Sequence, residues 1–559
     1  MITHIRIQNL RSLVDTGFIE IKPLTILLGA NSSGKSTFLR SFPLFTQSVS
    51  KSLREPISWF DDAYVDFGDY DTAKSKQASE GEGIMFSYKI QHPLCIRPRY
   101  YFFDNRLSEN DQTNPFLILP DSSVSLSFMK DSKGTFVNRV IIVKEELNVE
   151  FKVKERGALV EFFVNGESIW EESKLKCYYG SHRKLIPEFE SQRKYEDRLL
   201  SFESMINEFV YNVILKYCSK RLRNIERLMA ISNDWTHNKK TFLEILQNSK
   251  LTTLKNNASS WNIDSKSFKE IYNSLALLHT IKSLNAIDEE ISSMYSNCSY
   301  IAPMRAAANR YYRTQGLQVR DVDPYGKNLQ EFISSLSGNR EKSYRNFMER
   351  VLGLQIMVKN NAGHQQIILK SKYGENNMTD VGFGYSQILP IVTKLWHSNY
   401  RLMDESMLEY YWKDSYFSTM LIEQPELHLH PAMQARTIDI MMLVLTELEA
   451  INAKIKEMSK GKRNRYNIPL RMISQCNSSL IVETHSQAMI NRIGRRIRDK
   501  QFSADKVGIL MFEKNPETGK TEIKEIGFNE KGQLMNWPFG FFEPNEDEYD
   551  TLFNKQSED

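Results

Sequence analysis

The sequence predicts an α/β fold with three parts: a lobe built on a mixed sheet, a lobe of antiparallel strands, and a helical insertion. Residues 18–28 read as two strands, and the second is almost wholly apolar, as in a buried strand of a parallel sheet. Between residues 84 and 170, short strand-like stretches alternate with turn residues, which favours antiparallel pairing. Residues 190–300 carry Leu and Ile at helical spacing, without the sustained heptads of a coiled coil.

Composition excludes few classes of protein. The chain has 559 residues, enough for two or three folding units, and its net charge of +4 neither requires nor excludes nucleic acid. The five cysteines show no CxxC spacing, so we expect free thiols and neither zinc nor a disulfide framework. No apolar stretch resembles a signal core or is long enough for a bilayer, so we expect a cytoplasmic protein that does not span a membrane.

A phosphate-binding loop follows the apolar strand. Residues 29–37 read GANSSGKST, the G-x4-G-K-[ST] pattern, and a helix-like segment comes next. Glycines let several backbone N–H groups curl around phosphate oxygens, and the helix start adds its positive dipole end. A glycine turn without a ligand is the alternative, which the strand and helix on either side disfavour. The residues expected to contact the nucleotide here are Gly29, Asn31, Ser32, Ser33, Gly34, Lys35, Ser36 and Thr37.

An acidic strand end lies far along the chain from this loop. Residues 418–431 read STMLIEQPELHLHP, in which a short apolar run ends at Glu423. A carboxylate at the tip of a core strand beside a phosphate loop can hold Mg²⁺, and the hydroxyl of Ser36 is the second expected ligand. The alternative is a solvated strand end. Lys35 is expected to reach the β- and γ-phosphates.

Several segments together resemble a known family. The opening IRIQNLRS, the loop GANSSGKST, the segment EQPELHLHP and the later ETHS resemble ABC-type AAA-family ATPases of the SMC, Rad50, RecF and OLD group. APMRAAANRYY, DVGFGYSQILPIV and NWPFGFF resemble prokaryotic ATPases with a C-terminal DUF3696 segment, a group that overlaps the PtuA-like ATPases of Septu and retron anti-phage systems. The resemblance covers about residues 1–70 and 300–542 and omits the helical insertion.

The resemblance implies a P-loop ABC-type ATPase head that binds ATP and Mg²⁺. Its N-terminal half, with the phosphate loop and the antiparallel lobe, would occupy residues 1–180, and the helical insertion 181–300. The C-terminal half, with signature, Walker B, D-loop and H-loop, would occupy 301–500, before a DUF3696-like segment and tail at 501–559.

By the same resemblance, Glu423 is the Walker B carboxylate and Gln424 stands where most ABC ATPases have the catalytic Glu. An amide cannot accept a proton from the attacking water, so general-base catalysis would be lost at this position. Either Glu426 or a histidine replaces the base, or hydrolysis is slow and ATP is mainly a structural ligand. We favour slow hydrolysis. His485 follows the strand SSLIVE and resembles the H-loop histidine that contacts the γ-phosphate.

The segment DVGFGYSQ stands where the family has its signature. Glycines followed by serine at a helix start form an anion-binding turn, and the family places this turn against the γ-phosphate of a partner subunit. We expect Gly384, Ser386 and Gln387 to make that contact across a head-to-tail homodimer or a higher even oligomer. A capped helix without a ligand is the alternative. His428 and His430 fall in the D-loop region, where packing or interface roles are favoured over metal binding.

The function favoured by this resemblance is an ATP-binding regulatory subunit, or sensor, of a prokaryotic anti-phage defence complex. Nothing in the chain resembles a Toprim or HNH nuclease core, so the nuclease, of the HNH type, would be a separate chain. The alternative is a RecF-like DNA-repair or recombination ATPase with DNA-stimulated hydrolysis; a transporter head is a weaker third. Basic stretches at 460–465 and 492–500 are candidate contacts for DNA or RNA. A retron reverse transcriptase and its DNA product are further candidate partners.

Overall fold

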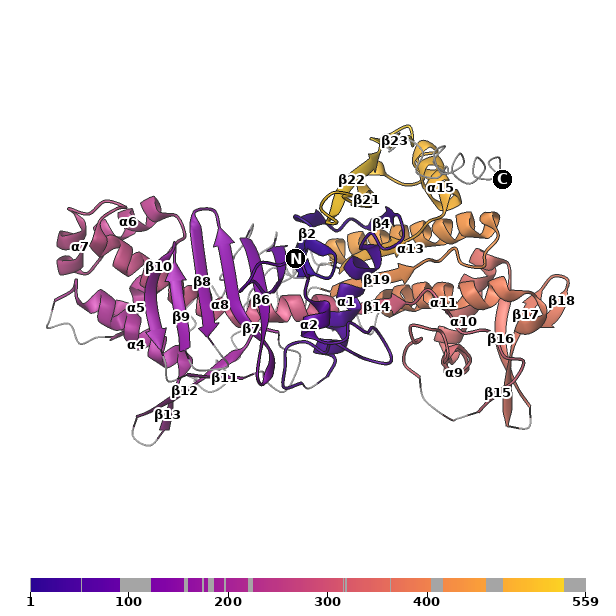
Figure 1. Ribbon diagram of the computed structural model, residues 1–559, viewed down its shortest axis with the longest axis horizontal. Coiled ribbons are helices and arrows are strands. Elements are labelled where there is room, and N and C mark those ends of the chain that lie inside the picture. The colour runs from indigo at the N-terminus through magenta and orange to yellow at the C-terminus, as the bar shows by residue number, and fades with distance from the viewer. Residues whose placement is uncertain are drawn as a thin grey trace, which may run out of the picture. The chain divides into compact units, whose positions relative to one another are not determined.

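The computed structural model divides into two compact units, and both are built from distant parts of the sequence. One comprises Met1–Glu20 and Arg40–Asn297, and the other Ile21–Leu39 and Cys298–Asp559 (Figure 1). The finer division into four segments stays a prediction. The structure describes residues 2–51, 53–90, 122–154, 159–172, 175–178, 185–195, 198–219, 225–314, 316, 319–361, 363–403, 416–458 and 476–536.

The second unit is organised around a sheet whose strand order is β14-β19-β20-β4-β21-β22-β23 among the described residues. Neighbours from β14 to β21 pair in parallel, whereas β22 and β23 add antiparallel strands at one edge. The sheet is therefore mixed, as predicted. Its strands are β14 (Cys298–Ile301), β19 (Tyr416–Glu423), β20 (Cys476–Glu483), β4 (Leu24–Gly29), β21 (Val507–Lys514), β22 (Thr521–Phe528) and β23 (Leu534–Met535).

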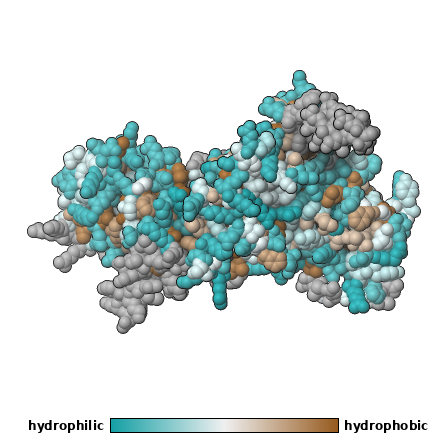
Figure 2. Space-filling view, in the orientation of Figure 1, coloured by the Kyte–Doolittle hydropathy of each residue, from teal (hydrophilic) through white to brown (hydrophobic). Residues whose placement is uncertain are grey.

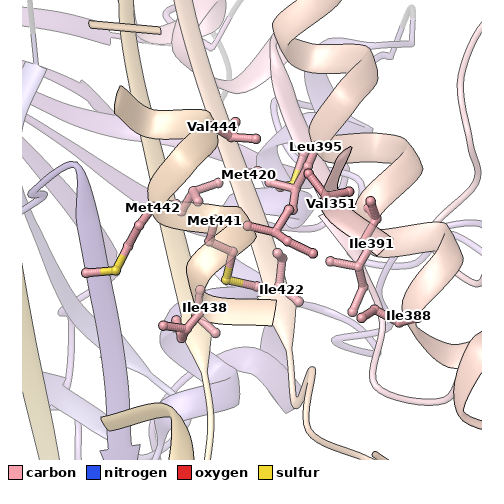
Figure 3. Packing of buried hydrophobic residues seen from close by; sticks show 14 of the residues in the cluster. Val351, Ile388, Ile391, Leu395, Met420, Ile422, Ile438, Met441, Met442 and Val444 are labelled. Carbon is pink, nitrogen blue, oxygen red and sulfur yellow. The ribbon is translucent and has the colours of Figure 1, made fainter. Parts of the chain in front are cut away.

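Strand β4 lies inside this sheet and is buried at every residue, which explains its apolar sequence. Helices pack against the sheet, and Ile391, Ile422 and Met441 from α11, β19 and α13 meet in the core (Figure 3). The helices of this unit are α9 (Leu329–Ser334), α10 (Gly338–Leu352), α11 (Phe383–Met403), α13 (Pro431–Met458) and α15 (Gln487–Arg498), with short 3₁₀ turns η1 (Met378–Asp380) and η2 (Ala504–Lys506). A small antiparallel sheet contains β15 (Tyr312–Arg313), β16 (Gln355–Asn361), β17 (His364–Ser371) and β18 (Gly374–Asn377).

The first unit contains the antiparallel lobe. Its main sheet has the order β10-β9-β8-β7-β6-β5-β1-β2, with β3 also pairing to β1. Buried residues alternate along β8, as expected of a sheet with one covered face. The strand predicted near residues 100–104 lies outside the described residues. The strands are β1 (Ile2–Leu10), β2 (Leu13–Asp15), β3 (Ile19–Glu20), β5 (Ile84–Ile90), β6 (Ser122–Asp131), β7 (Gly134–Lys144), β8 (Leu147–Lys154), β9 (Leu159–Val164) and β10 (Glu167–Glu172).

The helical segment expected over residues 190–300 begins later than predicted. Residues 188–201 form strands that pair with a preceding strand, so tertiary pairing overrides their weak local pattern. The last helix is long, but most of it is buried, so it is a core element and not an extended arm. The strands are β11 (Leu175–Tyr178), β12 (Glu188–Tyr195) and β13 (Arg198–Ser201), and the helices α4 (Phe202–Leu215), α5 (Ile225–Asn233), α6 (Lys239–Gln247), α7 (Thr252–Ala258) and α8 (Lys266–Ser296).

Two further helices are α1 (Lys35–Val49), which confirms the helix expected after the phosphate loop, and α2 (Tyr70–Ala73). The face seen in Figure 2 is mostly hydrophilic, with scattered hydrophobic residues. In the part of the chain that the structure describes, every helix is too short or too polar to cross a bilayer.

Candidate nucleotide-binding site

The phosphate loop connects the end of β4 to the start of α1. Gly29 has φ +146°, and a Cβ there would lie 2.2 Å from the carbonyl oxygen of Phe512 on β21. Only glycine, which has no Cβ, fits at this position so close to the neighbouring strand. Ser32 and Gly34 also have positive φ values, of 60° and 103°, which curl the loop. The structure thus forms the tight turn that the motif predicts.

Lys35 is buried at the base of the loop, with 3% of its surface exposed. Its Nζ donates to the carbonyl oxygens of Gly29 at 2.9 Å and Ala30 at 2.7 Å. Burial lowers the pKa of Lys35, and the charge of Glu483 opposes this shift. A buried ammonium group is costly unless a negative charge compensates it, so this position favours an anionic ligand.

The outer part of the loop is open to solvent while its base is anchored. Asn31 and Ser32 are exposed, Ser36 and Thr37 are half-buried, and Ser33 is buried. The carbonyl oxygen of Ser33 accepts a hydrogen bond from Thr521 on β22 at 2.9 Å, which ties the loop to the sheet edge. Ser33 Oγ is buried without a hydrogen-bond partner among the described residues.

Two carboxylates, and not one, stand at the strand ends beside this loop. Glu423 and Glu483 are register partners at the ends of β19 and β20, and they are 2% and 3% exposed. Ser36 Oγ donates to Glu483 Oε1 at 2.9 Å, and the hydroxyl of Tyr300 donates to Glu423 Oε1 at 2.8 Å. Hydroxyl and carboxylate oxygens are the ligands that Mg²⁺ prefers, so the donor set fits this ion.

Sequence reasoning missed Glu483. The available signal was a carboxylate at the end of an apolar strand, directly before the Thr-His pair, which is the pattern that identified Glu423. The assignment of Mg²⁺ to Ser36 and Glu423 stays a prediction.

The turn after β19 is held by a buried arginine. Arg305 donates to the carbonyl oxygens of Ala302 at 3.2 Å, Glu423 at 3.2 Å and Gln424 at 3.1 Å. Gln424 adopts φ +43°, and its N–H donates to the carbonyl of Glu483 at 2.8 Å. Burial lowers the pKa of Arg305 to about 10. Arg305 lies in the segment APMRAAANRYY, but the sequence predicted no role for this residue.

Glu426 holds the segment that follows β20. Its Oε1 accepts the backbone N–H of His485 at 2.7 Å, and its Oε2 accepts the hydroxyl of Thr484 at 2.8 Å. Burial raises the pKa of Glu426, and these hydrogen bonds oppose the shift. With both oxygens engaged, the carboxylate has a structural role in this arrangement.

His485 is half-buried beside the loop. Burial, and then the charge of Lys35, lower its pKa from 6.5, so the ring is neutral at pH 7. Its Nε2 is buried and makes no hydrogen bond within the described residues. Buried polar atoms are almost always paired, so a polar ligand between Lys35 and His485 would satisfy this nitrogen.

The signature segment lies partly inside the molecule. Helix α11 already begins at Phe383, so Gly384, Ser386 and Gln387 belong to its first turns. Ser386 and Gln387 are 3% and 1% exposed. Ser386 Oγ donates to the carbonyl of Phe383 at 2.6 Å, and Gln387 Nε2 to that of Arg305 at 3.4 Å. Both side chains therefore bond within their own chain, and the contact predicted across a dimer stays a prediction.

The segment that contains His428, predicted to be the D-loop, lies next to this helix start. The ring of Phe383, half exposed at 50%, meets the ring of His428 edge-on, with centroids 5.0 Å apart. His428 and His430 are exposed. Among the described residues, no group of three His, Cys, Asp or Glu side chains is placed to hold a metal ion.

A phosphate loop between β4 and α1, carboxylates at the ends of β19 and β20, and a following histidine define a P-loop ATPase head of the ABC type. The chain belongs to the AAA ATPase domain family, whose match covers residues 1–490. By family it is an AAA-family ATPase.

Solved structures similar to this chain include SMC heads. One is the Smc head domain with an extended coiled coil bound to the C-terminal domain of ScpA, from Pyrococcus furiosus, with 11% identity, TM-score 0.33 and coverage of 94% of this chain and 96% of that chain. Another is the SMC head domain from Thermotoga maritima, with 7% identity, TM-score 0.31 and coverage of 94% and 98%. No curated protein matches the sequence.

Proposed function

We propose that this chain binds ATP with Mg²⁺ in the loop of residues 29–37 and hydrolyses it slowly. The observation that carries the proposal is a buried cation, Lys35, near the half-buried neutral imidazole of His485, whose Nε2 has no hydrogen-bond partner among the described residues. Lys35 would hold the β- and γ-phosphates, Ser36 and Glu423 the cation, and His485 the γ-phosphate. Bound Mg²⁺ supplies charge neutralisation of the phosphates.

Slow hydrolysis follows from the turn after β19. Gln424 carries an amide where a base is needed, and the carboxylate of Glu426 is committed to Thr484 and His485. The amide cannot take a proton from water, and protonation of Glu426 would weaken the two hydrogen bonds that it accepts. A positioned general base contributes about 10²- to 10⁴-fold to a rate, so its loss leaves only positioning and electrostatics.

Replacing the amide tests this proposal. Gln424→Glu should raise the steady-state turnover of MgATP by about 10²-fold if the base is all that is missing. Gln533→Glu, the same change at an exposed position, serves as the control and should leave turnover unchanged. Wild-type turnover of many per second, unaffected by Gln424→Ala and abolished by Glu426→Gln, would contradict the proposal.

At the level of the cell, the proposed role is that of a cytoplasmic regulatory subunit in anti-phage defence, which controls a separate HNH-type nuclease. Support comes from the resemblance of the segments around Arg305, Gln387 and His485. If two heads bridge ATP, its binding free energy shifts the balance between open and closed states. Co-purification with the product of the neighbouring gene, followed by a nuclease assay with and without ATP, tests this role. Fast, DNA-stimulated hydrolysis would instead favour the RecF-like alternative.

Direct contact with nucleic acid has limited support from the described residues. Arg492 and Arg496 on α15 are both bonded to Asp439, at 2.6 Å in each ion pair. One carboxylate therefore offsets part of the charge of these two arginines. Arg495 and Arg498 remain largely exposed, although each pairs with Asp499. The basic stretch at 460–465 lies outside the described residues. DNA, RNA or a retron reverse transcriptase as partners remain proposals from resemblance.

A further inference from the structure

The hydroxyl of Ser36 donates a hydrogen bond to a residue for which the sequence motifs predict no role. Its acceptor is Glu483, with 2.9 Å between Ser36 Oγ and Glu483 Oε1. Glu423, the expected Walker B residue, instead accepts the hydroxyl of Tyr300. Strand order explains the arrangement, because β20 lies between β19 and β4. The end of β20 is therefore beside the end of β4, where the phosphate loop starts.

A serine hydroxyl has one proton and two lone pairs. It can act as a metal ligand only through a lone pair, so its proton must point away from the cation. Glu483 accepts the hydrogen bond from this hydroxyl, so the lone pairs of Ser36 point away from the carboxylate. An acceptor behind a metal ligand fixes the ligand's orientation and raises its basicity.

The backbone fixes where Glu483 can reach. It is the last residue of β20, and its carbonyl accepts the N–H of Gln424 at 2.8 Å. The next residue, Thr484, donates its N–H to the carbonyl of Leu27 on β4 at 3.2 Å. Both neighbouring strands thus hold this strand end, and the side chain is 3% exposed. Such a carboxylate is held in place before a ligand arrives.

We propose that Glu483 is the positioning residue that turns Ser36 toward the Mg²⁺ of a bound nucleotide, so that Glu483 more than Glu423 sets the metal dependence of nucleotide binding. This inference rests on the proposed nucleotide site. In this proposal the carboxylate that orients Ser36 comes from β20, at Glu483. Glu423 on β19 is instead anchored by the hydroxyl of Tyr300.

The test is to titrate binding of a fluorescent ATP analogue against free Mg²⁺. Glu483→Gln should raise the Mg²⁺ concentration for half-maximal binding by about 10-fold or more. Glu423→Gln should raise it less. Glu525→Gln, at an exposed position of β22, is the matched control and should match wild type. Binding in EDTA reports whether each variant still has a folded phosphate loop.

A double-mutant cycle separates a role through Ser36 from a general effect on the fold. If Glu483 acts through the hydroxyl, Glu483→Gln should add nothing to the Mg²⁺ dependence of Ser36→Ala, because coupled residues give non-additive effects. Additive effects would overturn the inference, as would a wild-type Mg²⁺ dependence in Glu483→Gln or a larger shift in Glu423→Gln. A wild-type protein with no affinity for adenine nucleotides would overturn the proposed function as well.

Discussion

His279 illustrates how burial sets the chemistry of a single residue. It lies on α8, where its ring stacks on Trp235 with centroids 4.7 Å apart and its Nε2 contacts the carbonyl of Ser232 at 2.7 Å. The second ring nitrogen, Nδ1, is buried without a hydrogen-bond partner among the described residues. Burial lowers the pKa of His279 from 6.5 to about 4, so the folded protein holds this ring neutral.

This shift predicts a loss of stability in mild acid. Between pH 6.5 and 4 the unfolded chain binds a proton at this residue and the folded chain does not, so stability falls as the pH falls. With the two pKa values 6.5 and about 4, the loss between pH 7 and 5 is about 2 kcal/mol. Urea unfolding of wild type and His279→Gln at both pH values measures it.

The variant should lose less stability than wild type over this interval, by about the same 2 kcal/mol. His430→Gln, at an exposed histidine, is the control and should retain the full dependence. An equal pH dependence in His279→Gln and wild type would contradict the assignment.

At the scale of elements, the turn after β19 depends on Arg305. Three backbone carbonyl oxygens accept hydrogen bonds from its guanidinium group. The backbone carbonyl of Arg305 in turn accepts a hydrogen bond from the side chain of Gln387 on α11. Arg305 is therefore a link between α11 and the turn after β19. The turn carries Gln424 and Glu426, and Glu426 in turn holds the backbone at His485.

Replacement of Arg305 should disturb both stability and the site. Arg305→Ala leaves buried carbonyl oxygens without donors, so it should lower the free energy of unfolding by about 2–4 kcal/mol and weaken ATP binding. Arg310→Ala removes an exposed arginine paired with Asp380 and should cost about 1 kcal/mol or less. Chemical denaturation and nucleotide titration of both variants measure these effects, and equal stabilities would contradict the role given to Arg305.

The parts that could be predicted from sequence are those with a local signal. The apolar run of β4, the glycine turn after it and the apolar run before Glu423 each occupy a few consecutive residues, and the structure confirms the elements that they predict. Glu483 and Arg305 were missed because their roles depend on partners that are distant in the sequence. Glu483 bonds to Ser36, 447 residues away, and Arg305 bonds to the carbonyl of Glu423, 118 residues away. The strands over 188–201 were missed for a similar reason, since pairing with β11 decides them.

At the scale of the whole molecule, we expect two copies to pair head to tail on ATP. The exposed ring of Phe383, next to His428 of the D-loop, is the described surface that a second copy would cover. Light scattering should show twice the monomer mass, or a higher even multiple, with ATP and Mg²⁺. Phe383→Asp should oppose pairing because it places a charge in an apolar contact. Tyr373→Asp, at another exposed aromatic, is the control. A monomer under all conditions would contradict the pairing.

The proposed function depends on binding of the ATP triphosphate by the loop around Lys35. Isothermal titration with a slowly hydrolysed ATP analogue and Mg²⁺ tests it most directly, on wild type, Lys35→Ala and the exposed control Lys51→Ala. We predict saturable binding to wild type and Lys51→Ala and a loss of at least about 10-fold in affinity for Lys35→Ala, since a charge-assisted hydrogen bond to phosphate is removed. Equal affinity in all three proteins, or no binding to wild type, would contradict it.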